Sequence, residues 1–392
     1  MTLSHNSLRE ANSLPAWIPC YNGSIVITSV LVKPAGPDCN LRCNYCFYRQ
    51  KAGLFTGKSH RMTDKVLETV IRDCMAMGCN TFSWQGGEPT MLGLDFFRKV
   101  VELEMRHGLP GTSVANALQT NGTLLDAGWA RFLAQYSFLV GLSIDGPARL
   151  HDHYRKDIHG KGTHKRIMTT AKLLRDHGVE FNVLVLLNDL NVKEPDAVYD
   201  FLKEQDIAFM QFVPCVEPGG KGQPAPFSIA PEAYGEFLVR VFDRWVEDFP
   251  NVSIRDFDDL LARELNRPPG TCTVSERCGS YVVIEHNGEV FTCDFFVTPK
   301  FRLGNMMETP LADLVHSERL EEFALAKAML GEICQACPFL DRCFGGCQKH
   351  RIVLGGDPTD PSYFCKAYRR LFAHAAPQMP ELADRIRQLG RA

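Results

Sequence analysis

The stretch DCNLRCNYCFYRQ, residues 38–50, places Cys39, Cys43 and Cys46 on one short loop. These short spacings let three sulfur atoms converge on one metal ion or cluster. A closed tetrahedral structural site needs four ligands, so the loop leaves one position to be filled. The loop therefore predicts either a structural zinc with a distant fourth ligand, such as Cys79 or a histidine, or a [4Fe–4S] cluster with one open iron.

The segments around this loop alternate between β-like and helix-like patterns. Residues 24–33 read as a buried strand that runs into the loop, and the helical segment after it has Thr63 as a candidate N-cap and Gly78 as a candidate stop. Further β-like runs, with amphipathic helical stretches between them, lie at residues 81–85, 113–119, 138–143, 181–187 and 209–213. The alternation predicts parallel strands joined by right-handed crossovers. About six such units are fewer than the eight of a complete barrel, so we expect an α/β fold built on a partial (β/α)6 barrel.

The position of the cysteine loop favours the cluster over the zinc. The loop follows the first strand of the βα series, at the C-terminal strand ends where such folds place their chemistry. Its aromatic neighbours Tyr45, Phe47 and Tyr48 can shield a cluster from water.

Composition limits the kinds of partner that the chain can have. The chain has 392 residues, of which 45% are hydrophobic, so it can bury a sizeable core and form about two domains. A net charge of -3 gives no general attraction for nucleic acid or for an anionic membrane, and no apolar run suggests a membrane span. The N-terminus lacks a secretory signal pattern, so we expect a cytoplasmic protein. In that reducing compartment, 15 cysteines indicate metal or cluster ligation rather than disulfides.

The same patterns divide the chain into segments. A Gly- and Pro-rich stretch at residues 215–228 ends the alternation, and a helical stretch follows it. The expected segments are an N-terminal extension at 1–23, the partial barrel at 24–228, a helical linker at 229–271, a cysteine-rich domain at 272–366 and a C-terminal helix at 367–392.

The pattern C-x3-C-x2-C, with an aromatic residue before the last cysteine, resembles the signature of radical S-adenosylmethionine enzymes. In that family the open iron chelates the amino and carboxylate groups of S-adenosylmethionine. Reduction then cleaves this cosubstrate to methionine and a 5′-deoxyadenosyl radical, which removes hydrogen from unreactive C–H bonds. The resemblance implies that the fourth position of the loop belongs to the cosubstrate.

Residues at the ends of the later β-runs are candidates for binding this cosubstrate. The segment WQGGEPT carries Gly87, which lets backbone approach a ligand, and Glu88, which can bind an ammonium. Asn121 and Ser143 can reach the ribose, and Arg155 can pair with the carboxylate. Taken singly, each residue is typical of a cap, a turn or a surface ion pair. The resemblance makes them candidate binding residues.

A second set of cysteines follows in the C-terminal third of the chain. Its members are Cys272, Cys278, Cys293, Cys334, Cys337, Cys343, Cys347 and Cys365. Eight thiolates suffice for two structural zincs, although the segment is not basic, which disfavours a zinc module for nucleic acid. Their order resembles the SPASM extension of peptide-modifying radical enzymes, which holds two auxiliary [4Fe–4S] clusters. Carried over by order, the near cluster takes Cys272, Cys278, Cys293 and Cys347, and the outer cluster takes Cys334, Cys337, Cys343 and Cys365.

Within that group, the flanks RCGS, FTCDFF and CFGGC look most like anaerobic sulfatase-maturating enzymes. The resemblance implies oxidation of a cysteine or serine, in a C/S-x-P/A-x-R motif of an unfolded sulfatase, to Cα-formylglycine. It implies three [4Fe–4S] clusters, a flavodoxin- or ferredoxin-like electron donor and Asp294 as proton acceptor, although an Asp beside a cysteine ligand can instead orient that ligand. By the same matching Tyr45 and Val216 contact the cosubstrate, together with Gly87 and the other candidates above.

Two other interpretations stay open from the sequence. One is a radical enzyme that forms thioether or carbon–carbon crosslinks in ribosomal peptides. Such enzymes often carry an N-terminal peptide-recognition domain, and the roughly two dozen residues before the first strand are too few for one, which disfavours this interpretation. The other is a zinc-stabilised scaffold without redox chemistry. The leftover cysteines, expected as small buried apolar residues, are Cys20, Cys74, Cys79 and Cys215.

Overall fold

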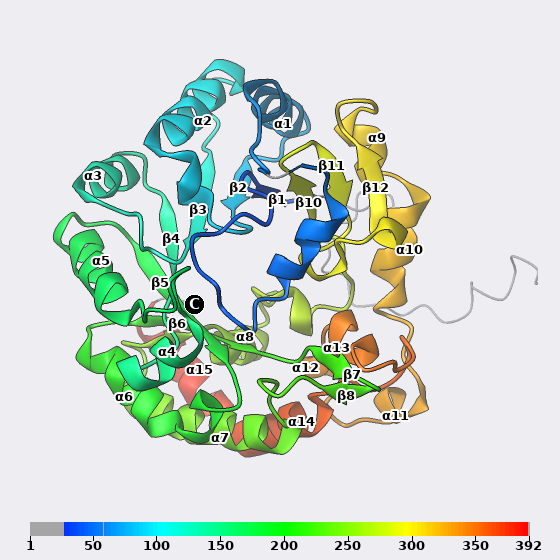
Figure 1. The fold of residues 1–392 in the computed structure, drawn as a ribbon. Coiled ribbons are helices and arrows are strands. Elements are labelled where there is room, and N and C mark those ends of the chain that lie inside the picture. The colour runs from blue at the N-terminus through cyan, green and yellow to red at the C-terminus, as the bar shows by residue number, and fades with distance from the viewer. Residues whose placement is uncertain (1–26, 58, 391–392) are drawn as a thin grey trace, which may run out of the picture.

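A computed structural model describes residues 27–57 and 59–390 of the chain. Its centre is a curved sheet of parallel strands with helices on the outer face (Figure 1). The first six strands are β1 (Ser29–Lys33), β2 (Thr81–Trp84), β3 (Ala115–Thr120), β4 (Leu139–Ser143), β5 (Phe181–Leu187) and β6 (Phe209–Pro214). They pair in chain order, which confirms the predicted partial barrel. The proposed N-terminal extension and Cys20 lie outside the described residues.

Helices connect these strands and cover the barrel. They are α1 (Asp64–Ala76), α2 (Leu94–His107), α3 (Ala127–Gln135), α4 (Ala148–Tyr154), α5 (His164–Asp176) and α6 (Pro195–Glu204). The predicted ends of α1 are confirmed, because Thr63 accepts a hydrogen bond from the backbone of Val66 at 3.3 Å and Gly78 has φ +76°. β1 begins later than expected, since residues 27 and 28 lie outside the strand.

The sheet does not end with the barrel. Strands β10 (Tyr281–Glu285), β11 (Glu289–Phe291) and β12 (Arg302–Asn305) come from the cysteine-rich segment, and β10 pairs in parallel with β1. Lys33 lies opposite Glu285 in this pairing. On the other edge the short strand β9 (Ser253–Ile254) pairs with β6. This extension, which was not predicted from the sequence, joins the cysteine-rich segment to the barrel sheet.

The remaining elements close the barrel and build the cysteine-rich part. They are the hairpin β7 (Pro218–Gly220) and β8 (Gln223–Pro224), α7 (Pro231–Asp248), α8 (Arg255–Glu264), α9 (Leu311–Val315), α10 (Glu318–Ala326), α11 (Glu332–Gln335), α12 (Leu340–Cys343), α13 (Gln348–Ile352), α14 (Cys365–Ala375) and α15 (Met379–Gln388). The single C-terminal helix expected at residues 367–392 is wrong. Pro377 interrupts it, since proline cannot donate the next helical hydrogen bond, and two helices result. No described helix is long and apolar enough to cross a membrane.

A buried polar network lies between α2 and the strands β2 and β3. Glu104 on α2 accepts a hydrogen bond from Asn116 at 3.0 Å, and Asn116 accepts one from the Trp84 indole at 2.7 Å. The second oxygen of Glu104 has no hydrogen-bond partner among the described residues. Burial raises the pKa of Glu104 to about 7, and the hydrogen bond from Asn116, which lowers this pKa, offsets only part of the effect.

We predict that Glu104→Gln stabilises the protein at alkaline pH. Because the folded-state pKa lies above the unfolded value, the folded state binds the proton more tightly, and stability falls as pH rises through this window. The variant should gain about 2–3 kcal/mol over the parent at about pH 8.5 and little at about pH 5. Thermal unfolding of equally loaded proteins measures this. The exposed Glu102→Gln on the same helix is the control, and a gain that is equal at both pH values would contradict the prediction.

Candidate active site

The cysteine loop is fixed by backbone contacts with the end of β2. The Gly87 amide donates to the Gly36 carbonyl at 2.7 Å, and the Glu88 amide donates to the Asp38 carbonyl at 2.8 Å. A Cβ atom at position 87 would lie 1.9 Å from the Asp38 carbonyl oxygen, so only glycine fits there. The GGE turn, residues 86–88, thus holds the backbone of Asp38, the residue that precedes Cys39, and we call this backbone contact the seat of the cysteine loop.

The three loop cysteines lie close enough to influence one another. Burial, together with the nearby Glu88 carboxylate, Cys43 and Cys46, raises the pKa of the Cys39 thiol to about 12. Burial likewise raises the pKa of Cys43 to about 11. The Cys39 sulfur accepts from the Leu41 amide at 3.3 Å. Thiolates are costly at this position unless a bound cationic centre compensates them, which fits a metal cluster.

Asp145 organises the residues beside Cys43. It is fully buried, accepts a hydrogen bond from the Tyr45 hydroxyl, and receives the Arg155 guanidinium as a fork at 2.9 and 3.1 Å. The charge of Arg155 partly offsets the burial that raises the pKa of Cys43. The structure therefore brings Tyr45 and Arg155 together at the cysteine loop through a carboxylate that the sequence analysis missed. The only signal for it was its place in SIDGP, two residues after Ser143.

The other predicted cosubstrate residues lie at neighbouring strand ends. Both oxygens of buried Glu88 are engaged: one accepts from Thr90 and Thr120, and the other accepts from the Asn121 amide at 2.8 Å. These bonds make Glu88 a structural cap, and its contact with a ligand ammonium stays a prediction.

Asn121, Ser143 and Val216 have protein partners as well. The Asn121 amide group donates to Asn40 at 2.9 Å and approaches the Cys39 sulfur at 3.8 Å. The Ser143 hydroxyl accepts from Gln119 at 3.1 Å. Val216 is fully buried, and its carbonyl accepts from the Lys349 ammonium at 2.9 Å. Contact of these residues with a cosubstrate stays a prediction.

Asp294 lies at the same end of the barrel. It follows Cys293 and opens the short helix η5 (Asp294–Phe296). The fully buried Lys33, at the end of β1, forms an ion pair with it and lies 3.9 Å from the centre of the Tyr48 ring. The Tyr48 hydroxyl in turn donates to Glu285. The partly exposed carboxylate of Asp294 is therefore held by the buried ammonium of Lys33, at the end of the strand that leads into the cysteine loop.

Four of the later cysteines gather next to Asp294. Burial raises the pKa of the Cys293 thiol well above its usual range, and the nearby Cys347 and Cys272 raise it further. Burial also raises the pKa of Cys278, to which Cys347 adds. The Tyr281 hydroxyl lies 3.2 Å from the Cys293 sulfur. This near set matches the grouping expected from the order of the cysteines.

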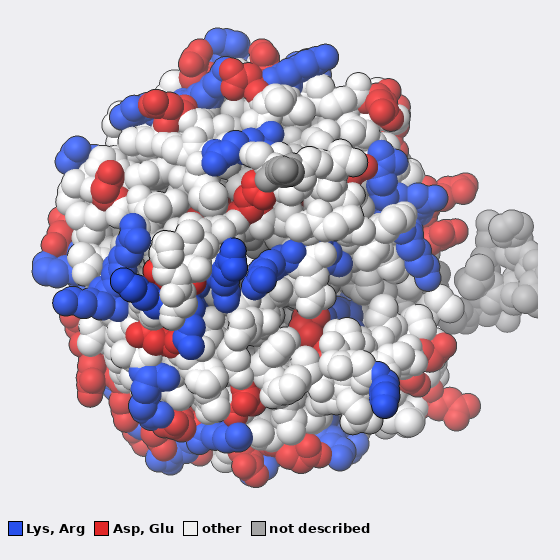
Figure 2. Space-filling model, viewed as in Figure 1, with Lys and Arg blue, Asp and Glu red and all other residues white. Residues whose placement is uncertain are grey.

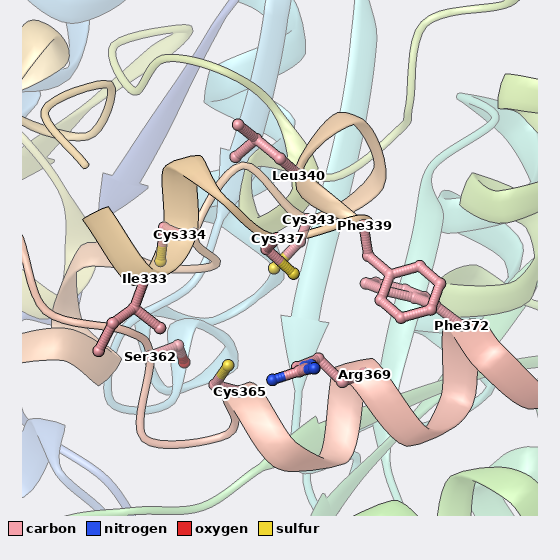
Figure 3. Close-up of a pocket in the computed structure, with 11 residues that line it drawn as sticks. Ile333, Cys334, Cys337, Phe339, Leu340, Cys343, Ser362, Cys365, Arg369 and Phe372 are labelled. Carbon is pink, nitrogen blue, oxygen red and sulfur yellow. The ribbon is translucent and has the colours of Figure 1, made fainter. Parts of the chain in front are cut away.

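The other four cysteines line a cavity that opens at the molecular surface. Figure 3 shows the sulfurs of Cys334, Cys337, Cys343 and Cys365 turned toward a common space, with Arg369 beside Cys365. No three His, Cys, Asp or Glu side chains in the described residues meet closely enough to hold one metal ion.

The leftover cysteines that the structure describes behave as expected. Cys74, Cys79 and Cys215 are buried, and Cys215 packs against Tyr45 and Tyr154 beside the candidate site. The fourteen cysteines in the described residues are all free.

Comparison with known proteins agrees with this geometry. Residues 34–202 match the radical SAM superfamily, and residues 272–338 match an iron–sulfur cluster-binding domain, SPASM. The serine-type anaerobic sulfatase-maturating enzyme of Bacteroides thetaiotaomicron is 40% identical over 89% of this chain and 90% of its own length. The cysteine-type enzyme of Clostridium perfringens is 38% identical over 92% and 99%. This chain belongs to the anaerobic sulfatase-maturating enzymes.

Solved structures match the same family. The structure of native anSMEcpe with bound AdoMet has a TM-score of 0.84 and 37% identity, and the match covers 91% of this chain and 99% of that one. SuiB of Streptococcus suis bound to its precursor peptide SuiA has a TM-score of 0.62 over 87% and 76%, but at 17% identity it shows only a shared fold.

Family membership decides between the two kinds of metal centre. Because this chain is a radical SAM enzyme with an iron–sulfur cluster-binding domain, it uses [4Fe–4S] clusters and S-adenosylmethionine. The zinc-stabilised scaffold is therefore wrong. The three cysteine groups described above fit three clusters by number and grouping. The assignment of individual cysteines, of Asp294 and of the cosubstrate contacts stays a prediction.

We predict that Gly87→Ala displaces the cysteine loop. Its methyl group would overlap the Asp38 carbonyl, so the N-terminal cluster should not load, and iron per chain should fall from about twelve to about eight. Cleavage of S-adenosylmethionine should fall by at least about 100-fold. Iron analysis and 5′-deoxyadenosine release measure this. The control is Gly53→Ala, whose methyl group meets nothing within 4 Å. Full cleavage by Gly87→Ala would contradict the role of the turn as a seat.

Proposed function

We propose that this enzyme oxidises a cysteine or serine, in a C/S-x-P/A-x-R motif of an unfolded sulfatase, to Cα-formylglycine. The observation that carries the proposal is the place of Asp294. It lies beside Cys293 of the near set and opposite Lys33, where β1 passes into the loop of the first three cysteines. A partly exposed carboxylate beside a proposed cluster ligand can serve as the base that this oxidation requires. The peptide complex reported for anSMEcpe supports a polypeptide substrate.

The bound cofactors supply a radical that removes a hydrogen from the target β-carbon and an acceptor for the electron left behind. The protein residues handle the proton and the orientation. Asp294 accepts the proton from the substrate sulfur or oxygen, while Lys33 fixes one of its carboxylate oxygens. Tyr45 and Arg155, held by Asp145, orient the cosubstrate beside Cys43. Burial of Tyr48, Lys33 and Glu285 keeps water away from the far side of this base.

Anaerobic incubation with a peptide that contains the motif tests the function. The purified enzyme, reductant and S-adenosylmethionine should release 5′-deoxyadenosine and convert the target residue to an aldehyde. A serine peptide should lose two hydrogen atoms, and a cysteine peptide should also exchange sulfur for oxygen. Relatives of both types are about equally similar, so both peptides are needed. An unmodified peptide, or one with an internal crosslink and no aldehyde, would contradict the proposal.

We predict that Asp294→Asn separates cosubstrate cleavage from product formation. Without a base, aldehyde formation should fall by about 10²–10⁴-fold while 5′-deoxyadenosine still forms. The exposed Asp313→Asn in the same domain is the control. Because Asn would leave the Lys33 ammonium buried without a counter-charge, the double variant Lys33→Met/Asp294→Asn should recover stability but not aldehyde. Full peptide conversion by Asp294→Asn would remove Asp294 from this role.

We also propose an acidic flavodoxin- or ferredoxin-like electron donor and a cytosolic setting. Arg42 and Arg49 are exposed on the cysteine loop and after it, and Lys161 lies on a segment that pairs with this loop through Leu41 and Asp157. Figure 2 shows basic side chains gathered across the middle of this face. Their charge complements an acidic donor. The free cysteines of the described residues support a reducing compartment.

A further inference from the structure

The two auxiliary cysteine sets are joined by one short loop, CFGGC, residues 343–347. Cys343 belongs to the outer set and Cys347 to the near set. The three residues between them all have left-handed backbone, with φ of +45° at Phe344, +70° at Gly345 and +68° at Gly346. A Cβ atom at Gly345 would lie 2.3 Å from the Arg351 guanidinium. The loop is therefore wrapped closely around Arg351.

Arg351 is a buried cation that has only neutral hydrogen-bond partners. It extends from α13, is 4% exposed, and donates to the carbonyls of Gly345, Phe344 and Pro358 at 3.0, 3.0 and 3.1 Å. It forms no ion pair with a carboxylate of the described residues. A buried guanidinium without a counter-charge is costly, so its anionic partner has to be sought in the cysteine sets.

The hydrogen bonds of Arg351 place its charge beside both sets. Its guanidinium donates to the carbonyls of Phe344, which follows Cys343 of the outer set, and of Gly345, which lines the outer cavity. Its helix α13 begins directly after Cys347 of the near set, which is the N-cap of that helix. The guanidinium thus lies within electrostatic reach of both auxiliary sites.

Two other cations each serve only one set. The buried Lys327 ammonium donates to the carbonyls of Cys272, Thr273 and Ser275, which hold the near loop. Arg369 is exposed at the rim of the outer cavity, where its charge acts on Cys365 (Figure 3). Arg351 is distinguished from both by its place between the sets.

We propose that Arg351 is a shared counter-charge for the two auxiliary clusters and raises the reduction potential of both. A fixed positive charge stabilises the reduced, more negative state of each cluster, and low local dielectric strengthens that effect. A near cluster that is easier to reduce accepts the substrate electron more readily. The proposal rests on the cysteine grouping and on the family cofactors, and it is independent of the identity of the peptide substrate.

The test is potentiometric and needs neither cosubstrate nor peptide. The full chain with Cys39→Ala, Cys43→Ala and Cys46→Ala retains only the auxiliary clusters, whose midpoint potentials are followed by electron paramagnetic resonance and visible absorption. In this background Arg351→Gln should lower both midpoints. The matched control, Arg369→Gln, should shift the outer midpoint only, and by less, because water screens its charge. Unchanged midpoints in Arg351→Gln, or a shift in only one of them, would overturn the proposal.

Arg351→Lys separates the effect of the positive charge on the midpoint potentials from the effect of the three hydrogen bonds that hold the loop. It keeps the positive charge but loses the planar fork that holds three carbonyls, so it should keep both midpoints near the parent values while unfolding at lower temperature. If Arg351→Gln fails to retain about eight irons, this variant decides the question. Iron-loaded Arg351→Lys with both midpoints lowered would show that loop geometry, not charge, sets the potentials.

Discussion

The contact on which the site depends is the backbone-to-backbone seat between Gly87 and Asp38. Because no side chain fits at position 87, the chain after β2 can approach the residues before Cys39, and its amides donate one hydrogen bond to Gly36 and one to Asp38. This seat fixes where the cysteine loop crosses the barrel mouth. The positions of Cys43 and Tyr45 on the loop then decide which side chains can meet them, and Asp145 at the end of β4 meets both Tyr45 and Arg155. A local glycine requirement thereby sets the layout of the cosubstrate side of the site.

The parallel pairing of β10 with β1 sets the other side. It makes the cysteine-rich segment a continuation of the barrel sheet, and Asp294, shortly after β11, reaches the Lys33 side chain of β1 and forms an ion pair with it. Lys33 is then the residue on β1 that can neutralise Asp294, and its burial against Tyr48 holds the pair in place. A flexible tether between separate domains would not hold a base and a cluster ligand to this geometry. The sheet itself is the device that couples the first cysteine loop to the near set.

The features that could be predicted from the sequence are those set by residues that lie close together along the chain. The three-cysteine loop, the βα alternation and the caps Thr63 and Gly78 are local patterns, and the structure contains them. The near and outer groups also emerged, because the order of cysteines resembles a known extension. The pairing of β10 with β1 joins residues about 250 positions apart in the chain, and no local pattern specifies it. The same distance hid the partnership of Lys33 with Asp294. Asp145 was missed because an Asp in a turn is ordinarily a cap, and Pro377 was overlooked within an amphipathic run.

Four cations with little exposure in the described residues, Lys33, Arg155, Lys327 and Arg351, fall into two kinds, and the difference bears on how the enzyme folds. Lys33 and Arg155 are paired with protein carboxylates, Asp294 and Asp145, so neither of these two cations needs a cofactor as its counter-charge. Lys327 and Arg351 are held only by carbonyl oxygens, and the groups of opposite charge near them are cysteine sulfurs. A neutral thiol does not compensate a buried cation, whereas thiolates bound to iron do so while also satisfying the metal. Cluster insertion therefore supplies the missing counter-charges of the cysteine-rich part, and the binding energy of the clusters becomes folding energy there.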